Sequence, residues 1–78
     1  MQLAFTKIKD EYAISTMYRE SSAMVQDCWY IETCVFTLNE EGLYGKMLLQ
    51  ESSGIVEIVA LDRHLEICKE ALEGKHDE

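Results

Sequence analysis

The run from Cys28 to Leu38, CWYIETCVFTL, constrains the fold of this chain more than any other stretch. β-Branched and aromatic residues dominate it, and it contains no glycine or proline, a composition typical of a strand. Alternation places Trp29, Ile31, Thr33, Val35 and Thr37 on one face and Cys28, Tyr30, Glu32, Cys34, Phe36 and Leu38 on the other. Both faces are largely apolar, so we predict the central strand of a small antiparallel sheet.

The segments before this run are less regular. Tyr12 to Arg19, YAISTMYR, alternates in the manner of a strand, although part of it also fits a helical spacing. Met1 to Asp10 fits either a short edge strand or the first turn of a helix, and its conformation stays open. Ser21 to Asp27 is polar enough to be the connection into the central strand.

A hairpin is predicted after Leu38. The sequence NEEG places Gly42 where a left-handed conformation is needed. Leu43 to Gln50 then returns as an antiparallel strand, with Gly45 marking a bulge or a close approach.

The last third of the chain carries a helical pattern from about Ile55 to Glu73, with Gly74 as its terminator. Its predicted core stripe consists of Ile58, Leu61, Leu65, Cys68 and Leu72. Ser52 and Ser53 offer an amino-terminal cap. The β-branched opening at 55–59 also fits a short fourth strand, and residues 75–78 are expected to be frayed.

These elements predict an α+β fold: an antiparallel meander of three to four strands with one carboxyl-terminal α-helix packed on one face, in a single domain over residues 1–78. The second face then needs a cover, which is the amino-terminal segment with Leu3 and Phe5, a second copy, or another protein. Trp29 and Tyr30 are interface candidates for that face, because large aromatic side chains anchor interfaces.

The chain has 15 acidic and 7 basic residues, a net charge of −8. This balance disfavours direct binding to nucleic acid or to an anionic membrane. It favours a basic protein partner, or it serves solubility alone. The sequence shows neither a membrane span nor a signal peptide, which predicts a cytoplasmic protein. Three cysteines without a CxxC pair predict reduced, mostly buried thiols.

No catalytic, cofactor-binding or metal-binding site is predicted. His64 and Cys68 have the spacing of two metal ligands, with Cys34 as a conceivable third, but a buried thiol beside a partly exposed imidazole is the favoured interpretation. Glu32 would form an acid–base pair only if it lay near His64, and Lys46 on the next strand is the more ordinary partner.

The predicted helix and the tail after it are the most acidic part of the chain. Asp62, Glu66, Glu70 and Glu73 are candidate interface residues that could follow one side of the helix. The alternative is a solvated helix face balanced by internal ion pairs.

The sequence also resembles a group of short uncharacterised proteins encoded by phages and prophages. The matching positions are Tyr12, Ser15 and Thr16, then Glu32, Thr33, Val35 and Phe36, and finally His64. The resemblance covers roughly residues 12–72 and implies an origin on a mobile element and a small sheet-plus-helix fold. It implies no particular activity.

Three functions are compatible with these features. The leading hypothesis is a non-enzymatic, acidic protein-binding module, a phage-derived modulator or inhibitor of a host protein, similar to anti-CRISPR proteins in size and charge alone. The second is a self-associating structural homodimer, and the third is a small enzyme or metal protein.

Overall fold

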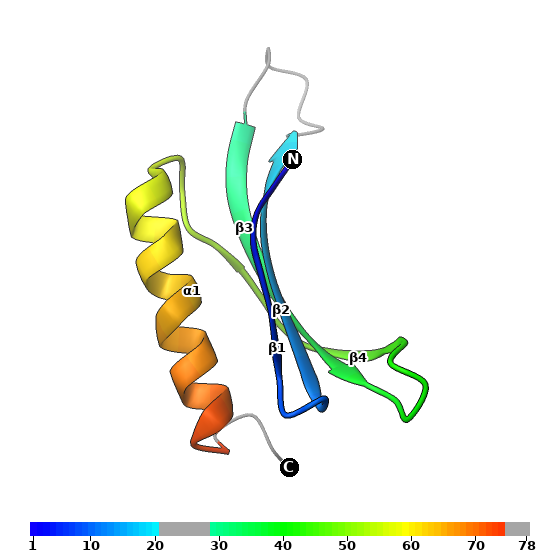
Figure 1. Ribbon diagram of the computed structural model, residues 1–78. Coiled ribbons are helices and arrows are strands. Elements are labelled where there is room, and N and C mark those ends of the chain that lie inside the picture. Colours follow the sequence, from blue (N-terminus) through cyan, green and yellow to red (C-terminus); the bar gives the residue numbers. More distant parts are fainter. Residues whose placement is uncertain (21–28, 75–78) are drawn as a thin grey trace.

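The computed structural model describes residues 1–20 and 29–74. Four antiparallel strands follow each other in space as they do along the chain: β1 (Gln2–Ile8), β2 (Tyr12–Glu20), β3 (Trp29–Leu38) and β4 (Tyr44–Ser52). The helix α1 (Glu57–Leu72) runs along one face of this sheet, as Figure 1 shows. The prediction of an α+β fold, with a meander and one carboxyl-terminal helix on one face, is confirmed.

The amino-terminal segment, for which the sequence left two conformations open, is the edge strand β1. A tight turn joins it to β2: Glu11 N–H donates to Ile8 O over 2.9 Å, and Lys9 and Asp10 have φ values of 54° and 57°. Two successive residues with positive φ define a type I′ turn, whose twist matches that of the strands it connects. Neither residue is glycine, so this turn carries a conformational cost.

The hairpin between β3 and β4 follows its prediction. Gly42 has φ 79°, and Asn39 Oδ1 accepts hydrogen bonds from the N–H groups of Glu41 and Leu43, each over 2.9 Å. Gly45 marks a close approach, as expected, because a Cβ atom at this position would lie 2.6 Å from Thr37 Oγ1.

Helix α1 starts and ends within two residues of its predicted bounds. The predicted serine cap is wrong: Val56 is the N-cap and makes no side-chain hydrogen bond there. Residues 57–59 belong to the helix, so the alternative of a short strand is also wrong. Gly74, with φ 78°, follows the C-cap Glu73 as predicted.

The two faces of the sheet differ in their cover. The face under α1, called the covered face below, includes Ile14, paired with Val35, and Thr16, paired with Thr33. The opposite, open face is not overlaid by any of the described elements. Phe5 is in the sheet itself and remains exposed, so the expectation that the amino-terminal segment folds back over this face is wrong.

Three predictions fall on residues outside the described ranges: the polar connection at 21–27, the position of Cys28, and the frayed tail at 75–78. Among the described residues, no helix combines the length and the apolar character needed to cross a membrane.

Candidate functional site

The rotation of α1 about its own axis decides which side chains remain available for binding. The residues it buries against the sheet are mostly small: Ala60, His64, Ile67, Cys68 and Ala71. Ala60 and Ala71 are almost fully buried, and their small side chains let the helix backbone approach the sheet closely.

His64 fixes this rotation by bridging two strands. Its Nδ1 lies 2.7 Å from Thr16 Oγ1 on β2, and its Nε2 lies 3.0 Å from Thr6 Oγ1 on β1. Thr16 Oγ1 is also 2.6 Å from Thr33 Oγ1 on β3. Burial lowers the pKa of His64, which favours the neutral imidazole. His64 is only 2% exposed, so the expectation of a partly exposed imidazole is wrong. The cluster is a satisfied polar contact within the core.

This rotation overturns the predicted core stripe. Only Cys68 of that stripe is buried, whereas its other four members form an exposed row on one flank of the helix, called the apolar stripe below. The apolar stripe consists of Ile58, Leu61, Leu65 and Leu72. Ile58 is 69% exposed and Leu65 is 66% exposed. Large apolar side chains gathered on one surface are typical of an interaction site.

The opposite flank of α1 is charged and tied to β4. Arg63 makes a bidentate contact with Glu51, with Nε to Oε2 at 2.6 Å and Nη2 to Oε1 at 3.1 Å. Its Nη1 also lies 2.7 Å from Glu66 and 3.6 Å from Glu70. Hydrogen bonding by Arg63 lowers the pKa of Glu51. Two of the four predicted acidic interface residues, Glu66 and Glu70, are thus partly neutralised within the chain.

The other two acidic candidates differ in position. Asp62 is exposed one residue before Arg63. Glu73 is the exposed C-cap of α1. The four carboxylates therefore do not form one uniform acidic surface: two of them surround an arginine, and one stands at the end of the helix.

The aromatic candidates lie on opposite faces. Trp29 is on the covered face beyond the amino-terminal end of α1, is 51% exposed, and with Met1 and Tyr18 lines an apolar hollow of about 310 Å³. Tyr30 alternates to the open face and is half-buried. The two side chains cannot anchor the same contact, so the expectation that both serve the second face is wrong for Trp29.

Glu32 lies on the open face and is only 6% exposed. It accepts hydrogen bonds from Arg19 Nε over 3.2 Å and from Gln50 Nε2 over 2.8 Å. Lys46 is the partner of Glu32 expected from the sequence. Its backbone N–H donates to Thr37 Oγ1, and Thr37 is five residues from Glu32 along β3. The sheet separates Glu32 from His64, so the two do not form an acid–base pair.

The two described cysteines, Cys34 and Cys68, are placed as inert thiols. Cys34 is on the open face and Cys68 is under α1, so the ligand set of Cys34 with His64 and Cys68 does not assemble. Both are buried and reduced as predicted, and burial raises the pKa of each thiol. Within the described residues, no group of three or more histidine, cysteine or carboxylate side chains is placed to hold a metal ion.

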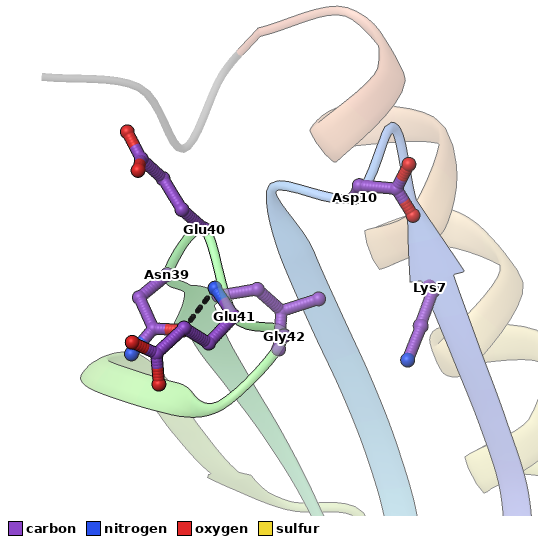
Figure 2. A pocket seen from close by; sticks show the side chains of 7 residues that line it. Lys7, Asp10, Asn39, Glu40, Glu41 and Gly42 are labelled. Carbon is purple, nitrogen blue, oxygen red and sulfur yellow. Dashed lines mark hydrogen bonds between the residues drawn. The ribbon is translucent and has the colours of Figure 1, made fainter.

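A second hollow, of about 340 Å³, lies between the two turns at one end of the sheet. Lys7 and Asp10 come from β1 and its turn, and Asn39, Glu40, Glu41 and Gly42 come from the loop before β4. Figure 2 shows that the carboxylates of Asp10 and Glu40 point away from each other. They do not converge on a common ligand position.

Sequence reasoning found the residues of the apolar stripe but assigned them to the core. The signal it missed was the neighbouring row of Ala60, His64, Ile67 and Ala71, which also has helical spacing. Thr6 and Thr16 contact the imidazole of His64 in that row, and Thr33 contacts Thr16. These threonines come from three strands, and the spacing of residues in the sequence does not show that the strands meet there.

No protein-family model matches this sequence, and neither the curated proteins nor the solved structures provide a match.

Proposed function

We propose that this protein is a non-enzymatic binding module that acts through contact with another protein. The observation that carries the proposal is the apolar stripe of α1. Its four side chains are exposed, and burying such side chains in a complex is favourable.

The arrangement of the reactive side chains supports a binding role over a catalytic one. His64 is held by two threonines beneath the helix, while Glu32 is bonded to Arg19 and Gln50 on the far side of the sheet. The pKa values of both described thiols are raised, which disfavours the nucleophilic thiolate.

The chemistry of the partner follows from the character of this surface. The stripe is apolar, and the acidic side chains nearest to Arg63 are already engaged on the other flank. We therefore expect an apolar contact at the stripe, and the net charge of −8 favours a basic host protein as the partner. In this proposal the protein is a cytoplasmic, phage-derived modulator or inhibitor, a role supported by the resemblance and by the net charge of −8.

The experiment is an affinity capture with the tagged protein from a nuclease-treated host-like lysate, washed at low and at high salt and identified by mass spectrometry. Leu65→Asp places a charge in the apolar stripe. Val59→Asp is the matched control, because Val59 is also exposed on α1 but lies outside the stripe.

The proposal expects one protein in comparable molar amount with the wild type and with Val59→Asp, and its loss with Leu65→Asp. Retention at high salt indicates that apolar burial dominates the contact, whereas release by salt assigns the contact to charged side chains. Capture that is equal for all three proteins contradicts a role for the stripe. If the wild type captures no lysate protein and does not associate with its own copies, the binding function is wrong.

A further inference from the structure

The apolar stripe and the outer edge of β1 lie on the same side of the molecule. Successive helix residues are turned by about 100° around the axis. His64 points to the sheet and Arg63 points toward β4, so Leu65, one step in the other direction, points toward β1. The stripe therefore overhangs the edge of the sheet that β1 forms.

That edge offers unpaired backbone groups. Ile8 O accepts from Glu11 N–H, so the backbone groups of Ile8 face β2. Because backbone groups alternate sides along a strand, those of Phe5 and Lys7 face outward. No described strand pairs with this side of β1. An open strand edge is a template for pairing with another chain.

We propose that the occupant of this surface is a second copy of the chain, related by a two-fold axis that passes near Thr6 and Leu65. This inference rests on the proposed function, because it uses the same apolar stripe as a contact surface. A second copy on the stripe then competes with a host protein for it. Antiparallel pairing about Thr6 sets Phe5 opposite Lys7 of the second copy, and both present outward N–H and C=O groups. The two sheets then join into one continuous sheet.

The same axis brings the helices together. Figure 1 shows that β1 and α1 run in the same direction, so a rotation that makes the strands antiparallel makes the helices antiparallel too. His64 bonds both β1 and β2, which places the helix over the space between these strands at the level of Thr6. Pairing of the two β1 strands then separates the helix axes by two strand spacings, about 10 Å. Packed helices are 8–10 Å apart, so both contacts form at once.

The register of this helix pair is self-complementary. Antiparallel packing about Leu65 sets Ile58 opposite Leu72 of the second copy, and Leu61 opposite the aliphatic stem of Lys69 of the second copy. The four members of the apolar stripe are thereby covered by the same interface.

Charge favours this surface for self-association over others. A chain with a net charge of −8 repels its own copies, and the repulsion is least where acidic residues are few. Residues 1–9 contain Lys7 and Lys9 and no acidic residue. The acidic cluster around Arg63 lies on the other flank of α1, away from the axis.

Sedimentation equilibrium of the wild type, Leu65→Asp and Val59→Asp tests this dimer. The wild type is expected at twice the 9.0 kDa of one chain. Leu65→Asp is expected to raise the dissociation constant at least tenfold, and Val59→Asp to leave it within about twofold. Far-ultraviolet circular dichroism checks that each variant is folded. A monomeric wild type, or equal dimerisation of the two variants, overturns the proposal.

Amide hydrogen exchange tests the strand pairing without any substitution in β1. The N–H groups of Phe5 and Lys7 are expected to be protected in the wild-type dimer and to exchange rapidly at dilutions where it dissociates. Fast exchange of both groups in the intact dimer overturns pairing at this edge. A monomeric wild type that still captures a lysate protein through Leu65 overturns the dimer and leaves the binding function intact.

Discussion

His64 Nδ1 lies 2.7 Å from Thr16 Oγ1 at a position where the histidine is only 2% exposed. Burial lowers the pKa of His64 from its ordinary value of 6.5, so the folded chain resists a proton that the unfolded chain accepts. The free energy of unfolding is therefore expected to fall as the pH decreases below about 6.5 and to be independent of this group above it. Denaturant unfolding across this range measures the effect.

His64→Gln is the control for this prediction, because it removes the titrating group and keeps a polar side chain. The difference in unfolding free energy between wild type and variant should shrink as the pH falls below about 6.5. Titration of the carboxylates affects both proteins equally and cancels in this difference. A difference that stays constant with pH would mean that His64 titrates alike in the folded and unfolded chains.

Gly45→Ala is expected to destabilise the protein by about 1 kcal/mol, measured by urea unfolding. The new Cβ atom would lie 2.6 Å from Thr37 Oγ1, and moving that hydroxyl breaks its hydrogen bond of 2.8 Å from Lys46 N–H. Thr37→Ala in the Gly45→Ala background should cost less than Thr37→Ala alone, since the bond is already lost. Additive costs would show that the two positions do not interact.

Asp10→Gly is expected to raise the free energy of unfolding by on the order of 1 kcal/mol. Asp10 has φ 57° in the type I′ turn, where glycine is unstrained, and the change leaves Lys9 Nζ able to reach Leu72 O over 3.3 Å. Asp10→Ala is the matched control and should destabilise instead, since alanine is disfavoured at positive φ. Thermal unfolding of the three proteins distinguishes them, and equal stabilities would contradict a strained turn.

Arg63→Ala is expected to cost about 1 kcal/mol of unfolding free energy, because Arg63 ties α1 to Glu51 and separates three carboxylates. Arg63→Lys keeps the charge but not the bidentate geometry, so an intermediate cost is expected. Raising the salt concentration in denaturant unfolding should narrow the gap between wild type and Arg63→Ala. If the difference in unfolding free energy between wild type and Arg63→Ala widens with salt, the cost of the substitution comes from lost packing and not from lost ion pairs.

The local structure of this chain was largely readable from its sequence. Alternation identified β2 and β3, and the glycines at 42, 45 and 74 marked a hairpin turn, a close approach and a helix end, all as observed. These features depend on side-chain period and on backbone conformations that few residues adopt. Such signals lie within a few residues of each other, so no knowledge of the fold is needed.

The placement of the candidate site was decided by tertiary structure. Helix α1 carries two rows with helical spacing, and hydropathy favours the one with Leu61 and Leu65. The sheet instead accepts the row with His64, because Thr6 and Thr16, ten residues apart in sequence, meet the imidazole there. The sequence by itself determined β2, β3, β4, α1 and the hairpin turn between β3 and β4, but it left the conformation of β1 open. Only the packing of helix on sheet decided which row became core and which remained exposed for a partner.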